Sequence, residues 1–154
     1  MNYSKLLIPS AAIIFLLVAG ILLLSKTSSA QYSQFSVDGK SFPITYLALN
    51  QAQWEKGLMN ATVTNTTTML FVFTNPGIYP FWMFDTDYNL DMIWVNGTAT
   101  SGKIVYVIEN ATSCFDASNC TIYTPNKTSN YVIEAKAGFV KRNGISTGDS
   151  VNFS

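Results

Sequence analysis

The chain opens with one long apolar run and then changes to short apolar stretches separated by polar turns. Residues 6–24 carry no charge and are almost wholly apolar. A helix of this length spans roughly 28 Å, close to the ~30 Å hydrocarbon core of a bilayer. Five residues precede the run, and a domain of about 120 residues follows it. We therefore expect a cytoplasmic tail at 1–5, a transmembrane signal anchor at 6–24, and a domain outside the cell membrane.

A cleaved signal peptide is the alternative interpretation of this run. Ser28 and Ala30 supply the small residues that signal peptidase requires before a cut at Gln31. The protein would then be secreted after cleavage near Ala30. Under either interpretation the remainder of the chain is exported.

After a Ser/Thr/Gln-rich linker at 25–34, the pattern predicts a domain over 35–154. Residues 35–37 and 41–49 read as a β-hairpin around Asp38-Gly39-Lys40. A short helix is expected from Asn50 to Leu58, with Asn50 as its N-cap, Gln53 in a capping-box position and Gly57 at its end. Further strand-like stretches occupy 68–73, 80–84, 91–95, 103–109, 131–135 and 151–153, with an Asn-Pro-Gly turn at 75–77 and a helical turn within 137–144.

Seven or eight short strands with Gly, Pro and Asn turns predict a mainly β fold. We expect one compact antiparallel sandwich or barrel-like domain with one or two short helices.

Composition excludes several classes of activity. Nine acidic and nine basic residues balance and form no basic patch, which argues against nucleic acid as a partner. The chain has no histidine, so no Ser-His or Cys-His nucleophile pair is available. No phosphate-binding glycine loop is present and no cofactor is expected.

Cys114 and Cys120 are the only cysteines and lie in a stretch of small polar residues. Structural zinc sites normally need four Cys or His ligands, and CxxC spacing is absent. In an exported chain this spacing predicts a disulfide that pins a loop.

Glycosylation sequons are enriched in the chain. Eight of its 13 asparagines begin Asn-x-Ser/Thr, whereas Ser and Thr make up only about one residue in five. Apart from Asn2 in the tail, we expect a glycosylated surface at Asn60, Asn65, Asn96, Asn110, Asn119, Asn126 and Asn152.

An ordered set of motifs over about residues 42–153 resembles one family closely. The motifs are Gly57-Leu58-Met59, Met69–Phe73, Phe81-Trp82-Met83, Leu90–Val95, Gly102–Val105, Cys120 with Tyr123 and Pro125, Val132-Ile133-Glu134 with Ala137-Gly138, and Gly144-Ile145 with Gly148-Asp149. They resemble the DUF192 (UPF0127) domains, which implies a compact, mainly antiparallel β domain, commonly exported or lipid-tethered, with no established activity. The family usually has a basic residue where this chain has Asn60, and Lys-Asn-Thr where this chain has Phe84-Asp85-Thr86.

The polar stretch after the Phe-Trp-Met motif contains possible metal ligands. Asp85, Asp87 and Asn89 alternate as in the opening of a calcium loop. The match then breaks, because Leu90 replaces the turn glycine and Asn96 the bidentate glutamate. A solvated acidic turn is the alternative.

Four methionines near tryptophans raise the possibility of a Cu(I) thioether site. They are Met59, Met69, Met83 and Met92. Strand periodicity gives them a simpler role in core packing.

Asp91 and Glu134 adjoin or interrupt apolar runs, where a carboxyl can have a raised pKa and act as general acid or base. The structural alternative is that each accepts backbone hydrogen bonds or pairs with Lys103 or Lys136. A two-carboxylate glycosidase would need both groups in one cleft.

Aromatic residues crowd the stretch from Tyr79 to Tyr88, where they can line a pocket or pack in the core. We therefore expect a membrane-tethered binding or structural module that engages envelope proteins or glycans through the 79–91 region. Its candidate binding residues are Phe81, Trp82, Asp85, Asp87, Asn89 and Asp91. The alternative is a carboxylate-dependent enzyme that acts on an envelope glycan.

Overall fold

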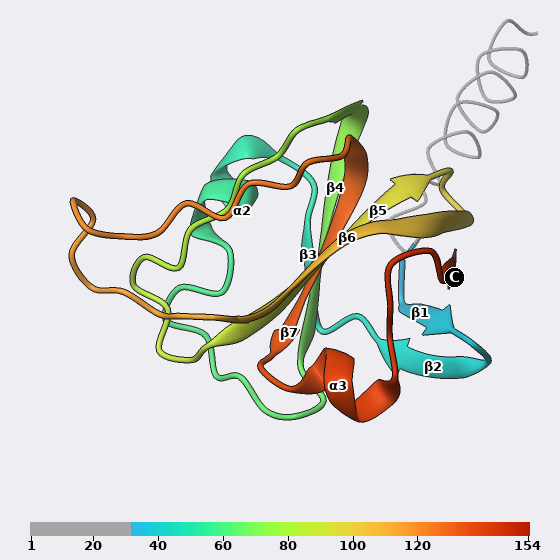
Figure 1. The fold of residues 1–154 in the computed structure, drawn as a ribbon, viewed down its shortest axis with the longest axis horizontal. Helices are drawn as coiled ribbons and strands as arrows, with labels where there is room; N and C mark the ends of the chain where they lie inside the picture. The colour runs from blue at the N-terminus through green and yellow to red at the C-terminus, as the bar shows by residue number, and fades with distance from the viewer. Residues whose placement is uncertain (1–31) are drawn as a thin grey trace, which may run out of the picture. The chain divides into compact units, whose positions relative to one another are not determined.

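A computed structural model describes residues 32–154, which form a β-rich domain with two short helices (Figure 1). Its strands are β1 (Gln34–Val37), β2 (Lys40–Pro43), β3 (Tyr46–Ala48), β4 (Thr68–Gly77), β5 (Leu90–Gly97), β6 (Ser101–Ala111), β7 (Ser129–Lys136) and β8 (Ser150–Phe153), and its helices are α2 (Gln51–Lys56) and α3 (Phe139–Asn143). The expected anchor at 6–24 lies outside the described residues. Among residues 32–154, no helix has the length and apolar character needed to cross a bilayer.

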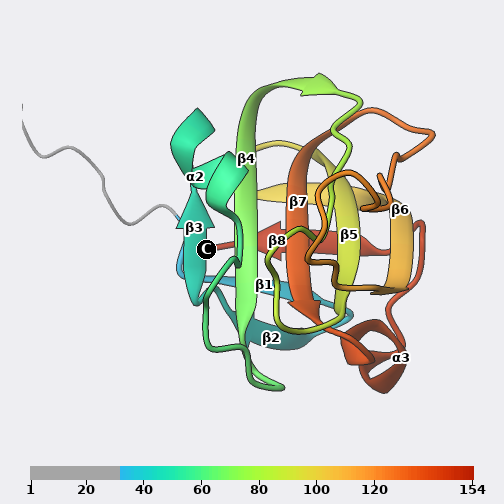
Figure 2. The same ribbon diagram turned by 90° about the vertical axis from the view of Figure 1, so that its left-hand side faces the viewer.

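The strands form one sheet in the order β2-β1-β8-β6-β5-β7-β4-β3. Its two edge strands, β2 and β3, are consecutive in the chain and joined only by Ile44 and Thr45. The sheet therefore curls into a half-barrel, and Figure 2 shows β8, β1 and β2 crossing behind β4, β7 and β5. The prediction of a mainly β domain with one or two short helices is confirmed, but the expected antiparallel sheet is a mixed one, because β3 pairs with β4 in parallel.

Local sequence explains where the first elements begin and end. The β1–β2 hairpin turns at Asp38 and Gly39, whose φ angles are 49° and 77°, the left-handed region that an Asp-Gly turn adopts readily. The expected helix is present as α2. The Asn50 side chain accepts a hydrogen bond from the Gln53 amide (3.1 Å), and Gly57 ends the helix with a φ of 49°.

Three expected elements take a different form. The expected strand at 41–49 is split in two, since β2 and β3 pair at opposite edges of the sheet. Residues 80–84 do not join the sheet and make only isolated bridges, from Phe81 to Tyr123 and from Phe84 to Cys114. The expected turn at 75–77 instead forms the end of β4, after a shift of register against β7.

The two faces of β7 pack against different apolar cores. Ile133 and Ala135 face a first core enclosed by the curl of the sheet and α3. Val132 faces a second core, on the other side of the sheet, together with Leu58 of the turn after α2 and Met83. Because β7 is buried on both faces, its apolar residues Tyr131, Val132 and Ile133 follow one another rather than alternating with polar ones.

Candidate functional site

Glu134 is the most unusual polar group of the described domain. It lies in the middle of β7, opposite Met69 of β4 on one side and Met92 of β5 on the other. The residue is only 4% exposed, and its carboxyl makes no hydrogen bond with any of residues 32–154. Burial raises the pKa of Glu134 from 4.5 to about 8. The group is therefore a neutral carboxylic acid near pH 7.

The Glu134 side chain lines a small cavity of about 30 Å³. Residues 54–59, from α2 and the turn after it, form one side of this cavity. Phe71 of β4 lines it as well. Residues 78–89, between β4 and β5, form the segment that crosses the second core, and Phe81, Trp82 and Thr86 of this segment also line the cavity. We call this cavity the Glu134 pocket.

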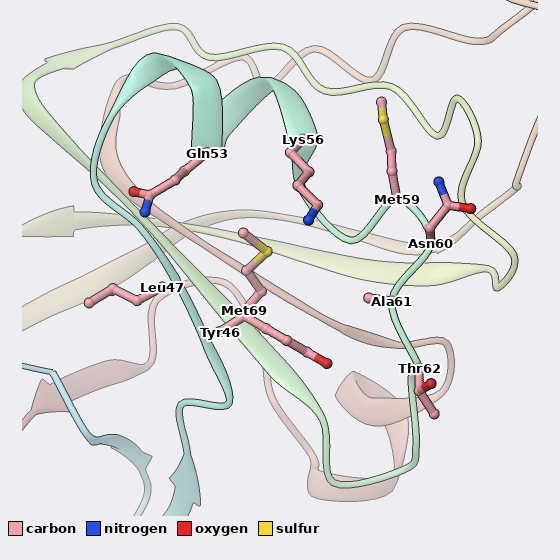
Figure 3. Close-up of a pocket in the computed structure, with 10 residues that line it drawn as sticks. Tyr46, Leu47, Gln53, Lys56, Met59, Asn60, Ala61, Thr62 and Met69 are labelled. Atoms are coloured by element: carbon pink, nitrogen blue, oxygen red, sulfur yellow. The ribbon is translucent and has the colours of Figure 1, made fainter.

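A larger pocket adjoins the Glu134 pocket and shares Lys56, Gly57 and Met59 with it. Its volume is about 450 Å³. Figure 3 shows Lys56 reaching down from α2 above Met69 of β4, with Tyr46 of β3 beside it. Asn60 and Thr62 add polar groups, so we call this the polar pocket.

A second adjoining pocket has a volume of about 350 Å³ and shares Trp54, Glu55, Phe81 and Trp82 with the Glu134 pocket. Phe73 and Tyr79, which stack with ring centroids 3.7 Å apart, also line it. We call it the aromatic pocket. The buried acid thus lies between a polar and an aromatic surface.

The structure separates the two carboxylates that a glycosidase would bring together. Asp91 is the register partner of Ala135, whereas Glu134 is the partner of Met92. Successive side chains of a strand point to opposite faces, so Asp91 faces the first core and Glu134 the second. The pair that a two-carboxylate mechanism needs is not formed.

Asp91 has the structural role that the sequence offered as an alternative. Its two carboxylate oxygens accept hydrogen bonds from the backbone amides of Asn110 and Val140, each at 2.9 Å. The residue is fully buried and ties the ends of β6 and α3 to β5.

The expected lysine partners of Glu134 lie elsewhere. Lys103 donates to the Gly148 carbonyl (3.3 Å), and the Lys136 ammonium lies 5.0 Å from the centre of the Tyr88 ring. The structural alternative therefore does not account for Glu134.

The proposed calcium ligands do not converge. Asp85 accepts a hydrogen bond from the Asn60 side chain (3.1 Å), and Asn89 accepts one from the Ser113 amide (3.1 Å). Asp87 is exposed. In the described part of the chain, no three His, Cys, Asp or Glu side chains form a metal-binding group.

The methionines considered for copper have a packing role instead. Met69, Met83 and Met92 are buried in the second core, and Met59 lines the Glu134 pocket.

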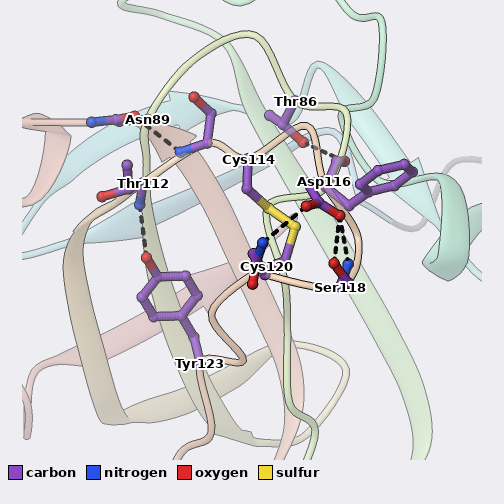
Figure 4. The surroundings of a disulfide bond; sticks show 11 residues. Thr86, Asn89, Thr112, Cys114, Asp116, Ser118, Cys120 and Tyr123 are labelled. Carbon is purple, nitrogen blue, oxygen red and sulfur yellow. Dashed lines mark hydrogen bonds between the residues drawn. A yellow bond between two sulfur atoms is a disulfide. The ribbon is translucent and has the colours of Figure 1, made fainter.

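The expected disulfide between Cys114 and Cys120 is confirmed (Figure 4). Cys114 also pairs with the segment that crosses the second core, since its amide donates to the Met83 carbonyl (3.1 Å) and its carbonyl accepts from the Asp85 amide (2.9 Å). Hydrogen bonds from Ser118 hold the pKa of Asp116, inside the loop, below its usual range. The cross-linked loop thus supports the segment that carries Phe81 and Trp82.

The candidate binding residues divide into two groups. Phe81 and Trp82 line the Glu134 pocket. The other four, Asp85, Asp87, Asn89 and Asp91, do not line it. The sequence indicated Glu134 as a candidate because the residues around it are apolar. It gave no indication that α2 would lie beside Glu134, because that contact joins segments far apart in the chain.

A family model described as "Uncharacterized ACR", DUF192, matches residues 34–153. The chain belongs to the DUF192 family. A crystal structure of a candidate transcription regulator from Sinorhizobium meliloti 1021 is similar to it, with 29% identity, a TM-score of 0.67, and coverage of 79% of this chain and 95% of that one. A protein of unknown function from Novosphingobium aromaticivorans DSM 12444 is similar at 26% identity and a TM-score of 0.66, with coverage of 78% and 84%. The comparison with curated proteins gives no match.

The DUF192 motifs gather around the buried acid. Residues 57–59, 81–83 and 132–134, which are far apart in sequence, each contribute to the Glu134 pocket or its walls. The two departures from the usual DUF192 sequence are also neighbours. Asn60 donates to Asp85, and both have left-handed backbones with φ angles of 56° and 53°.

Proposed function

We propose that this DUF192 domain is an extracytoplasmic binding module whose ligand occupies the Glu134 pocket and the aromatic pocket beside it. The observation that supports the proposal is an unpartnered, buried carboxyl that lines a pocket. Burying a polar group without a hydrogen bond costs about 2–7 kcal/mol, depending on the reference medium. A ligand in the pocket can supply the missing hydrogen bond or ion pair to this carboxyl.

Binding accounts for the site better than catalysis does. Asp91, the carboxylate that the enzyme hypothesis combined with Glu134, faces the other core. Glu55 is the other carboxylate that lines the pocket, and it accepts a hydrogen bond from the Gln51 side chain (2.8 Å). Without histidine, the chain also lacks the common base for a hydroxyl or thiol nucleophile. The S. meliloti relative is described as a candidate regulator, but nine acidic and nine basic residues give this chain no excess positive charge for DNA.

The extracytoplasmic location rests on three independent features. The apolar run at 6–24 is long enough for an anchor, the sequons are enriched, and the disulfide suits an oxidising compartment. We infer a glycosylated domain that is either tethered to the membrane or released near Ala30. None of the seven sequon asparagines of the domain lines the aromatic pocket, whereas Asn60 lines the polar pocket. The ligand therefore enters from the aromatic side.

The test is native mass spectrometry of the full-length protein purified from its own cell envelope in mild detergent. We expect a co-purified small molecule on the wild-type protein and its loss from the Glu134→Ala variant. Lys103→Gln, an exposed position on β6 that does not line the pocket, is the matched control and keeps the ligand. If wild type and Glu134→Ala retain the same molecules, or neither retains any, the proposal fails.

A further inference from the structure

We propose that the group bound in the Glu134 pocket is a primary ammonium, carried on an apolar body that lies in the aromatic pocket. Glu134 is the counter-ion in this arrangement. The inference deepens the proposed function and rests on it.

The size of the Glu134 pocket limits the group that enters it. A cavity needs about 10–15 Å³ to hold one water, so about 30 Å³ admits one or two groups of that size. An ammonium head group meets this limit, because it is close to water in size. A trimethylammonium group is several times larger and does not fit.

The walls of the pocket suit a cation with several hydrogen-bond donors. Trp54, Phe71, Phe81 and Trp82 line it, and aromatic rings attract cations through the negative potential of their faces. An ammonium group offers three donors. The Glu134 carboxylate can accept from it, as can the Thr86 hydroxyl, whose own hydrogen is donated to the Phe84 carbonyl (3.3 Å).

The other charged groups that line the Glu134 pocket are compatible with a bound ammonium group. Glu55 and Lys56 of α2 are the other charged side chains that line the pocket, and their charges cancel. The elements on the other sides contribute Phe71, Phe81 and Thr86, and none of these is ionisable. Lys56 repels an entering cation and attracts an anion, so its removal distinguishes the two classes of ligand.

An anionic ligand is the competing interpretation. It would accept a hydrogen bond from the neutral acid and pair with Lys56. The aromatic faces disfavour it, and any ionised fraction of Glu134 repels it. We therefore favour the ammonium ligand.

The adjoining aromatic pocket accounts for the rest of the ligand. Trp54, Phe81 and Trp82 line both spaces, so a chain attached to the ammonium passes directly from one to the other. A short alkyl or aryl body suits its walls, which include Phe73, Tyr79 and Pro80.

Ion pairing makes binding depend on pH. In the free protein the pKa of Glu134 is about 8, so below that pH an ammonium binds only when the acid releases its proton. Affinity then rises about tenfold per pH unit between about pH 6 and 8. It levels off above pH 8 and falls once the amine loses its own proton near pH 10. A ligand that needs the neutral acid shows the opposite trend.

The experiment is isothermal titration of the full-length protein in detergent with n-butylammonium. The comparison probes are n-butanol, butyltrimethylammonium and butyrate. We expect binding of n-butylammonium alone, with release of about one proton at pH 6.5 when buffers of different ionisation enthalpy are compared. Glu134→Gln should lower the affinity at least 30-fold and abolish proton release.

Two further variants sharpen the result. Lys56→Gln should tighten n-butylammonium binding about two- to fivefold, and Thr86→Val should weaken it several-fold. Glu109→Gln, an exposed change on β6, is the control and leaves the affinity unchanged. Urea unfolding of each variant confirms that it is folded.

The outcomes separate the two proposals. If butyrate or butanol binds in a Glu134-dependent way and n-butylammonium does not, the ammonium assignment fails while the binding function stands. If n-butylammonium binds wild type and Glu134→Gln equally, the assignment also fails. If no probe binds and no molecule co-purifies, both proposals fail.

Discussion

Asp91 and Glu134 lie on adjacent strands one residue out of register, so their carboxyl groups point to opposite faces of the same sheet. Both are buried, but two backbone amides bind Asp91 and none of residues 32–154 hydrogen-bonds to the Glu134 carboxyl. The sheet therefore carries one carboxylate that stabilises the fold and one acid that is held at a cost. The two residues should respond differently to substitution.

Glu134 should make the stability of the domain fall as the pH rises. The pKa of its carboxyl is about 8 in the folded state and near 4.5 in an unfolded chain, so between these values the folded state alone holds the proton. Stability is therefore lost from about pH 4.5 to about pH 8, by roughly 3–5 kcal/mol in total. Glu134→Gln should remove this loss.

The measurement is urea unfolding of both proteins at pH 4.5, 6 and 8. The difference between variant and wild type should grow steadily in favour of the variant. A difference that is the same at every pH would mean that Glu134 titrates normally in the folded protein.

Asp91→Asn should be strongly destabilising at neutral pH. An asparagine side chain has one acceptor oxygen, so its NH₂ group would face the amide of Asn110 or Val140 in a buried site. We expect a loss of about 2–4 kcal/mol in the free energy of unfolding. Asp149→Asn, which alters an exposed turn bond to the Ser146 amide, is the control and should cost under about 1 kcal/mol. Equal losses in the two variants would contradict the structural role of Asp91.

Reducing the disulfide should weaken the domain modestly. The bridge between Cys114 and Cys120 closes a loop with a sequence separation of 6, which contributes about 2 kcal/mol in the chain-entropy model. The double variant Cys114→Ser, Cys120→Ser should show this loss in urea unfolding, and reductant should lower wild type to the same value. No response of wild type to reductant would indicate that the bond does not form.

Ser129→Ala should be neutral or stabilising. The Ser129 hydroxyl is fully buried and has no hydrogen-bond partner within residues 32–154. Removing an unsatisfied polar group gains about 1 kcal/mol. Thermal unfolding measures the effect, and Thr68→Ala serves as comparison, because the Thr68 hydroxyl donates to the Pro43 carbonyl and its loss should destabilise. If Ser129→Ala destabilises the domain as Thr68→Ala does, the hydroxyl has a partner.

The sequons should differ in occupancy. Asn65 and Asn126 are exposed and should carry glycans in the native host. Asn96 is half-buried in β5, and its side-chain amide donates to the Thr128 carbonyl (3.2 Å), so it should remain unmodified. Glycopeptide mass spectrometry of the native protein tests this pattern. A glycan at Asn96 would contradict it.

Local patterns predicted the local elements of the fold well. The cap at Asn50, the Asp38-Gly39 turn and the apolar run of β7 depend on residues adjacent in sequence, and each is present as expected. The parallel pairing of β3 with β4 was not predictable in this way. It depends on the curl of the whole sheet, in which the chain passes from one edge strand, β2, directly to the other, β3.

The candidate site shows the same division. An acid inside the apolar run of β7 was visible in the sequence, as was the aromatic stretch that includes Phe81 and Trp82. In the folded domain, these residues and α2 line one cavity. This contact joins parts of the chain that are far apart in sequence, so the periodicity of apolar residues could not predict it. The alternative hypothesis that Asp91 and Glu134 share a cleft failed for a related reason, because the faces to which residues of two paired strands point depend on the register between the strands.

The three tryptophans of the chain give this site an intrinsic optical reporter. Trp54 and Trp82 line the Glu134 pocket, and Trp94 lies directly behind Phe81, with ring centroids 5.9 Å apart. Indole emission responds to nearby charge and to the exclusion of water. All tryptophan fluorescence of the protein therefore comes from residues that line the pocket or lie directly behind it. Unlabelled compounds can be screened for binding by the change they cause in fluorescence intensity and emission wavelength.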